Sequence, residues 1–272
     1  MKTAIQLVLI YFGFLQILAP MLMVVPCIIY LLATTGAVDK DSLMQMIIIP
    51  AQMTGILLMV IYLWKAGYIS KEKTTWSAVS PSYLGLSVVS LLSCSWLVST
   101  LISHMEWLPN IMEQTFDILQ SGWGGILAIA VAGPVLEELL FRGAITKALL
   151  KQYDPAKAIL ISAFIFGVFH INPIQVVAAF LIGLLLAWVY YKTASLLPCI
   201  LMHILHNSIS VYLNIKYPGM DDMDALVGGT ASLIITCVAA VLLVGCYWLM
   251  KRTTISYPWK KDTDIEILTD ND

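Results

Sequence analysis

Residues 133–142 read GPVLEELLFR and place two adjacent carboxylates, Glu137 and Glu138, inside a segment that is otherwise apolar enough to span a membrane. Charged side chains at that depth are costly, so they usually face a protein interior or a water-filled cavity and mark a functional site. The alternative is a helix at the membrane surface that carries ordinary charged residues. Features elsewhere in the sequence distinguish these two interpretations.

The spacing within this stretch distinguishes the two glutamates. Glu138 and Arg142 are four residues apart, so on a helix they share a face and can pair. Glu137 and Arg142 are five apart and do not share that face. Pro134 lacks an N–H group and disturbs the helix just before the pair, which favours a polar, hydrated pocket. The pattern predicts that Arg142 neutralises one carboxylate, that of Glu138, and leaves the carboxylate of Glu137 without this partner.

The composition indicates a membrane protein. Of the 272 residues, 60% are hydrophobic and only 12% are charged, whereas soluble domains carry about 25% charged residues. The net charge of −2 says nothing about nucleic acid, but no basic patch is interleaved with aromatic residues, and we expect no nucleic-acid partner. We therefore predict an all-α, polytopic membrane helical bundle, with an integral membrane domain over residues 1–250.

The apolar segments predict about eight transmembrane helices. Each is about long enough to cross ~30 Å of hydrocarbon, the fifth and sixth being the shortest. They fall at roughly 5–33, 44–64, 83–103, 123–149, 156–171, 174–191, 195–215 and 229–250.

The distribution of lysine and arginine predicts the orientation. With the N-terminus in the cytoplasm, thirteen of these residues fall inside, and only Lys40 and Lys216 fall outside. Basic residues concentrate in cytoplasmic loops, so both termini are predicted to be cytoplasmic. Residues 251–272 alternate in charge and end acidic, which is typical of a disordered cytoplasmic tail.

Histidines from two further segments reach a depth similar to that of the glutamates. At 1.5 Å per helical residue, Glu137 lies about 21 Å from Lys151, His170 about 20 Å from Lys157 and His203 about 16 Å from Lys192. Taken singly, His170 could cap a helix end and His203 could be a buried histidine bonded to a carbonyl. Their agreement in depth favours one shared site, because clustered buried ionisable groups mark chemistry.

Each histidine has a neighbour four residues away on the same helical face. Phe166 can pack against the ring of His170 and help to fix it. Asn207 shares a face with His203, where it could be a functional donor or an interhelical hydrogen-bonding residue.

Three motifs, in this order, resemble those of the CPBP family: Glu137-Glu138-x-x-x-Arg142, Phe166-x-x-x-His170 and His203-x-x-x-Asn207. That family holds the CAAX-type prenyl proteases (Rce1-like endopeptidases) and the bacterial Abi and bacteriocin-immunity proteins, and includes lysostaphin-resistance-like proteins. The resemblance covers about residues 120–215, whereas residues 1–100 carry no matching motif. It implies an integral protein of a bacterial inner (plasma) membrane.

The resemblance implies an intramembrane endopeptidase that hydrolyses a peptide bond near the cytoplasmic side of the membrane. Glu137 and His170 would activate the water, and His203 and Asn207 would form the oxyanion hole. Such hydrolysis needs a base for the water and donors aimed at the developing oxyanion.

Glu138 would pair with Arg142 and hold the shape of the site. The expected partners are the lipid bilayer and a peptide or protein substrate that is either lipid-modified or membrane-bound.

Metal dependence and two further functions remain as alternatives. The HExxH pattern of zincins is absent, and we expect no cofactor; in a zinc-dependent version, Glu137, His170 and His203 would be the ligands. A non-proteolytic CPBP-fold immunity or scaffold factor need not keep every motif residue. A transporter with a proton relay should show related halves, but the first 100 residues hold no buried ionisable group that mirrors the second half.

Overall fold

The computed structural model describes residues 2–218, 227–252 and 259 of the chain. Within these residues the secondary structure is helical, with turns and short connections and without β-strands, as predicted. Most of the predicted disordered tail, residues 253–258 and 260–272, lies outside the described residues.

All eight predicted apolar segments form helices, but one of these helices is shorter than the membrane is thick. Seven helical spans in the described part of the chain are long and apolar enough to cross a membrane. The eighth is α9, Pro155–Phe169, with 15 residues. At 1.5 Å per residue it is about 22 Å long, shorter than the ~30 Å hydrocarbon core. The orientation of the bundle remains a prediction from charge.

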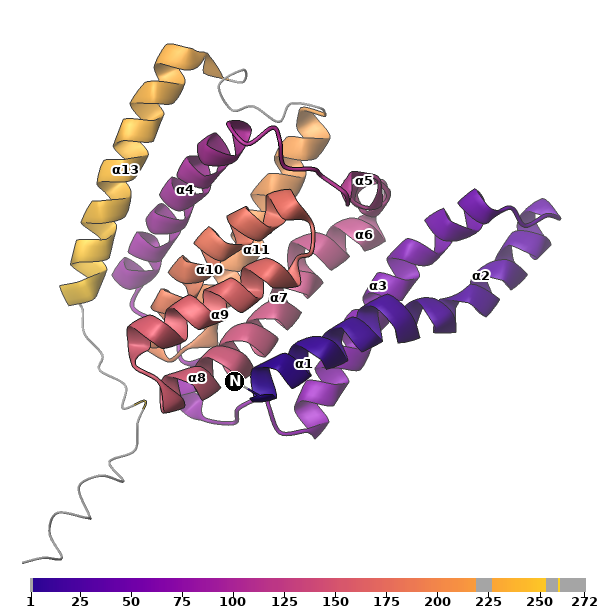
Figure 1. The fold of residues 1–272 in the computed structure, drawn as a ribbon, viewed down its shortest axis with the longest axis horizontal. Coiled ribbons are helices and arrows are strands. Elements are labelled where there is room, and N and C mark those ends of the chain that lie inside the picture. Colours follow the sequence, from indigo (N-terminus) through magenta and orange to yellow (C-terminus); the bar gives the residue numbers. More distant parts are fainter. Residues whose placement is uncertain (1, 219–226, 253–258, 260–272) are drawn as a thin grey trace, which may run out of the picture.

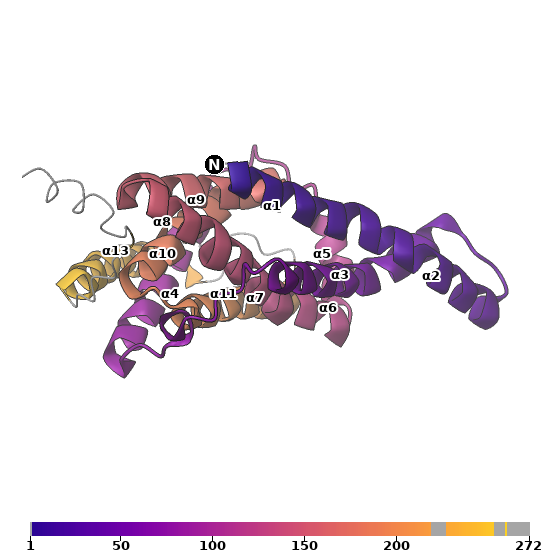
Figure 2. The same ribbon diagram turned by 90° about the horizontal axis from the view of Figure 1, so that it is seen from below.

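The two edges of the bundle are formed by the two ends of the chain. α1 (Lys2–Phe12), η1 (Gly13–Leu18) and α2 (Ala19–Thr35) make one continuous span, which pairs with α3 (Lys40–Lys65). At the opposite edge, α13 (Gly229–Arg252) packs beside α4 (Pro81–Ser103) (Figure 1; Figure 2). Short elements η2 (Lys73–Trp76) and α5 (Glu113–Gln120) lie in the connections.

The span that carries the two glutamates is not a uniform α-helix. It runs through α6 (Trp123–Leu127), η3 (Ala128–Ala132), α7 (Gly133–Glu138), η4 (Leu139–Thr146) and α8 (Lys147–Gln152). Both η3 and η4 are π-helical, and such wide turns are frequent at functional sites. Sequence periodicity did not predict either of them.

Three helices surround this span and position the site. α9 packs along α10 (Pro173–Thr193), while α7 and η3 pack against α11 (Leu196–Lys216). Local sequence fixes where these helices begin. Asp154 accepts a hydrogen bond from the backbone of Lys157, and Ser195 accepts one from that of Leu197, so each satisfies a free N–H of a first turn.

Candidate active site

Glu138 is the centre of a fully buried charge network. Its Oε1 lies 2.7 Å from Arg142 Nη1 and 2.7 Å from His203 Nδ1, and the side chains of Glu138 and Arg142 are both 0% exposed. Arg142 also donates to the carbonyl of Gly183, and its guanidinium lies over the ring of Phe166. The pairing predicted from the four-residue spacing is confirmed, and a bond to His203 is added to it.

Glu137 faces two imidazoles without bonding directly to either. Its Oε2 lies 3.7 Å from His203 Nε2 and 3.9 Å from His170 Nε2, which is too long for a hydrogen bond. This oxygen is buried and has no hydrogen-bond partner. The geometry suits a small third group, such as a water molecule, that contacts the oxygen and the ring nitrogens together.

Hydrogen bonds fix the orientation of both rings. His170 Nδ1 lies 2.8 Å from the carbonyl oxygen of Phe166. Because a carbonyl only accepts, His170 carries a proton on Nδ1 and turns the lone pair of Nε2 toward Glu137. The ring of Phe166 also packs edge-on against His170, as predicted. His203 donates Nδ1–H to the carboxylate of Glu138, so its Nε2 faces Glu137 as well.

Asn207 lies one turn beyond His203 on α11 and holds a carbonyl that Pro134 leaves without a donor. In η3 the backbone N–H of Gly133 bonds to Ala128, five residues back. By the same register residue 134 should bond to Ile129, but proline has no N–H. Asn207 Nδ2 supplies that bond to the carbonyl of Ile129, at 3.0 Å. One amide N–H is therefore structural, and the second is left for another acceptor.

The turn after His170 contains two residues whose importance the sequence did not reveal. Ile171 has a φ of 60°, a left-handed conformation that is strained for a β-branched residue. Asn172 is fully buried and bonds both to the side chain of Asn110 and to the backbone N–H of Ile111. The turn is thus fastened to the connection between α4 and α5. The only sequence signal was the helix-ending Asn172-Pro173 pair.

These contacts also bear on the depth of the site. His170 lies at the end of α9 that is farther from Lys151 and Lys157. The connection that holds Asn172 is one that the charge pattern predicts to lie outside. The position near the cytoplasmic side stays a prediction, and the contacts favour a site deeper in the bundle.

Glu137, His170 and His203, the three predicted zinc ligands, face one point. They have part of the geometry that a zinc site requires. Ligand atoms of a tetrahedral zinc site lie about 3.4 Å apart, and the separations of 3.7 and 3.9 Å are a few tenths longer. Each ring has an acceptor on Nδ1, as histidines that bind zinc usually do. Among the described residues, no group of three His, Cys, Asp or Glu side chains already has the geometry of a metal site.

The fold and this cluster define a polytopic helical membrane protein with a buried carboxylate–histidine site. Residues 119–209 match the model of the family described as type II CAAX prenyl endopeptidase Rce1-like. This segment is about a third of the chain and carries all six predicted site residues, so the chain is similar to that family in this part.

A curated protein is also similar to part of the chain. The chain is 29% identical over 104 residues to "Putative membrane peptidase YdiL" of Bacillus subtilis (strain 168), a stretch that covers 38% of this chain and 43% of that protein. The chain therefore matches less than half the length of this curated relative. No solved structure matches the chain.

Proposed function

We propose that this protein is an intramembrane endopeptidase in which Glu137 is the base that activates water. The observation that carries the proposal is the oxygen of Glu137 that lacks a hydrogen-bond partner while facing the Nε2 atoms of His170 and His203. A carboxylate held in this way is available to accept a proton, whereas one oxygen of Glu138 already bonds to both Arg142 and His203.

The proposed reaction begins with a water molecule between Glu137 and His170. One O–H donates to Glu137 Oε2 and the other to the lone pair on His170 Nε2, which orients the water oxygen toward a peptide carbonyl. As the water oxygen attacks the carbonyl carbon, the proton of the O–H that bonds to Glu137 is transferred to that carboxylate. The same proton then moves to the leaving amine nitrogen when the C–N bond breaks, so the carboxylate is regenerated.

His203 and Asn207 form the proposed oxyanion hole. His203 can donate from Nε2 only if it carries both ring protons, because Nδ1–H already bonds to Glu138. In that state Nδ1–H bonds to Glu138 and Nε2–H can donate to the oxyanion. The second amide N–H of Asn207 is the other donor, since the first bonds to Ile129.

The zinc-dependent version is the second candidate, and one observation favours it. The acceptors on both Nδ1 atoms leave two Nε2 lone pairs facing a carboxylate. Glu137, His170 and His203 would hold the ion, which would polarise the substrate carbonyl and the attacking water.

The site and the comparisons both support a class of substrate. The family description names a CAAX prenyl endopeptidase, and the relative's name describes a membrane peptidase. A buried site among membrane-spanning helices receives a peptide through the bilayer or from its surface. We therefore propose a substrate that is either lipid-modified or membrane-bound.

N-terminal proteomics of membranes tests this function even while the substrate is unidentified. Cells that express the wild-type protein are compared with cells that express Glu137→Ala at the same level. New N-termini in membrane-bound or lipid-modified proteins should appear only with the wild type. Identical sets of N-termini would instead support the non-proteolytic immunity or scaffold factor.

A further inference from the structure

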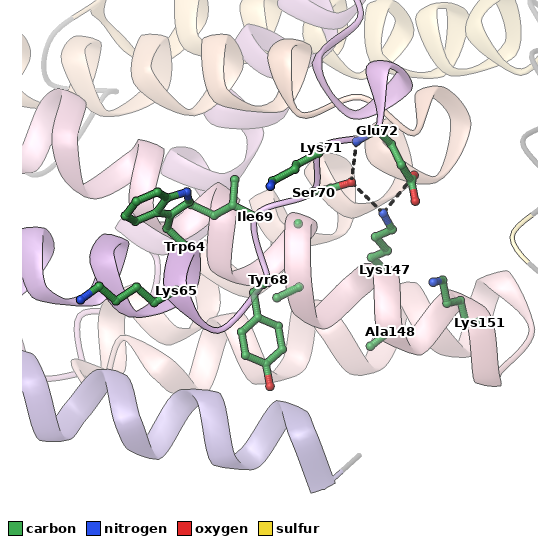
Figure 3. Close-up of a pocket in the computed structure, with 13 residues that line it drawn as sticks. Trp64, Lys65, Tyr68, Ile69, Ser70, Lys71, Glu72, Lys147, Ala148 and Lys151 are labelled. Carbon is green, nitrogen blue, oxygen red and sulfur yellow. Dashed lines mark hydrogen bonds and ion pairs between the residues drawn. The ribbon is translucent and has the colours of Figure 1, made fainter.

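A second pocket lies away from the glutamate–histidine cluster, at the lysine-rich end of the bundle. It has a volume of about 1010 Å³ and lies between the end of α3 with its following loop, residues 66–72, and the helix formed by η4 and α8 (Figure 3). Gly143 and Ala144, which follow Arg142 directly, form part of one wall. The pocket therefore touches the helix that carries the candidate active site.

The pocket has a strong excess of positive charge. Four lysines line it, Lys65, Lys71, Lys147 and Lys151, against a single carboxylate, that of Glu72. Lys147 is engaged by Ser70 at 3.2 Å and by Glu72 at 3.1 Å. The other three lysines are exposed. Such a pocket attracts an anionic group.

An exposed apolar stripe on α3 leads into the pocket. Leu57, Ile61 and Trp64 are spaced by four and three residues, so they share one helical face, and they are 59%, 38% and 62% exposed. Trp64 belongs both to this stripe and to the pocket lining, where Tyr68 follows it one turn later. Tryptophan and tyrosine at the end of a span are typical of the membrane–water interface.

The positive charge of the pocket and the apolar stripe on α3 together indicate the class of ligand. We propose that this pocket binds an anionic phospholipid, with the phosphate of the headgroup against Lys71, Lys147 and Lys151 and an acyl chain along the stripe of α3. A soluble phosphate compound would use the lysines alone, whereas a phospholipid also contacts the apolar stripe that leads into the pocket. The positive-inside pattern predicts that the pocket faces the cytoplasmic leaflet, which is rich in anionic lipids, and basic pockets between helices on that side bind such headgroups.

Native mass spectrometry of the purified, delipidated full-length protein tests the proposal. The protein is titrated with phosphatidylglycerol, and in parallel with phosphatidylcholine of the same acyl chains. We expect tighter retention of phosphatidylglycerol. Lys71→Gln/Lys151→Gln should weaken that binding by about 30-fold, since each lysine near an anionic lipid contributes about fivefold. Both lysines are exposed, so this double variant should fold normally.

The matched control removes two other exposed lysines from the same end of the bundle. Lys157→Gln/Lys251→Gln carries the same change of charge outside the pocket and should keep wild-type affinity. Equal retention of the two lipids, or equal loss of affinity in both double variants, would overturn the site. Displacement of the lipid by soluble glycerol phosphate at matched concentration would overturn the assignment to a lipid and indicate a soluble phosphate ligand.

A second measurement locates the lipid. Phosphatidylglycerol brominated on its acyl chains should quench the fluorescence of Trp64, and Trp64→Phe should remove that part of the quenching. Lys71→Gln/Lys151→Gln should reduce it, while the control double variant should not. Quenching that is the same in wild type and Trp64→Phe would contradict the placement of the acyl chain. Neither measurement depends on proteolysis, so the lipid site and the proposed activity can fail separately.

Discussion

His203 Nδ1 lies 2.7 Å from Glu138 Oε1 and joins α11 to α7 across 65 positions of sequence. The same oxygen accepts from Arg142, so Glu138 is tied to two other side chains. Glu137 and Glu138 each have a buried Oε2 without a hydrogen-bond partner, and that of Glu137 faces the Nε2 atoms of His170 and His203. We propose that Glu138 is the structural carboxylate and Glu137 the chemically available one.

The first prediction concerns the stability of the two glutamate variants. Glu138→Gln leaves Arg142 buried without its counter-charge and should lower the free energy of unfolding by about 3–5 kcal/mol. Glu137→Gln should change it little, because Glu137 makes no direct hydrogen bond through the exchanged oxygen. Thermal unfolding of both variants in the same detergent measures the difference.

A double variant checks that the loss comes from the unpaired arginine. Glu138→Gln/Arg142→Met removes both charges and should recover part of the stability lost in Glu138→Gln. Equal unfolding temperatures for Glu137→Gln and Glu138→Gln would contradict the division of roles.

Local spacing predicted part of this site and long-range packing decided the rest. The pair of Glu138 and Arg142 followed from helical geometry, because both lie on one helix four residues apart. The bond between Glu138 and His203 did not, since only the packing of α7 against α11 brings these residues together. The sequence assigned His203 to the face of Asn207 and gave no sign that its other ring nitrogen is held by Glu138.

The fold, too, was predicted in part from local sequence and determined in part by long-range packing. Apolar segments predicted all eight helices, because composition alone determines which stretches are stable in a bilayer. Their lengths were less certain, and α9 ends at Phe169, too early for a full span. The π-turns on both sides of α7 depend on Pro134 and on the bond from Asn207 to Ile129, and no periodic pattern encodes that combination.

Asn207→Ala should affect both stability and turnover. It leaves the carbonyl of Ile129 without a donor, which costs about 1–3 kcal/mol when the group is buried. If Asn207 also donates to the oxyanion, turnover should fall about 100-fold or more with little change in substrate binding. Unfolding measurements and steady-state cleavage rates report the two effects separately.

Pro134→Ala separates the two roles of Asn207. It restores a backbone N–H that can bond to Ile129, so Asn207→Ala/Pro134→Ala should recover stability relative to Asn207→Ala. Turnover should stay low, because the oxyanion donor is still missing. Recovery of turnover together with stability would show that Asn207 is structural only.

Ile171→Gly should stabilise the protein. Its φ of 60° costs isoleucine about 1–3 kcal/mol, and glycine adopts that conformation without strain at a cost of up to about 1 kcal/mol in chain entropy. Ile171 is 54% exposed, so little packing is lost. We expect a net gain of about 1 kcal/mol in unfolding free energy, with slower cleavage as the turn after His170 loosens.

Ile171→Val is the matched control for this strain. Valine is also β-branched and keeps the unfavourable conformation, so its stability should stay close to that of the wild type. If the glycine variant were no more stable than the valine variant, the turn would not be strained.

Chelation distinguishes the two proposed mechanisms. If Glu137 acts without a metal, the purified protein should keep its cleavage rate after dialysis against a strong chelator, and elemental analysis should find no stoichiometric zinc. Loss of activity on chelation, restored by added zinc at about one ion per chain, would make Glu137, His170 and His203 metal ligands.

The most direct test of the central claim is the initial rate of peptide cleavage by purified protein in liposomes, with a substrate found by N-terminal proteomics. Glu137→Gln is compared with wild type and with Glu113→Gln, which makes the same exchange on α5. We predict that Glu137→Gln lowers the rate by about 100- to 10,000-fold, as expected for loss of a general base, with an unchanged unfolding temperature, while Glu113→Gln cleaves at the wild-type rate. A Glu137→Gln variant that cleaves within a few-fold of the wild-type rate would contradict the assignment of Glu137 as the base.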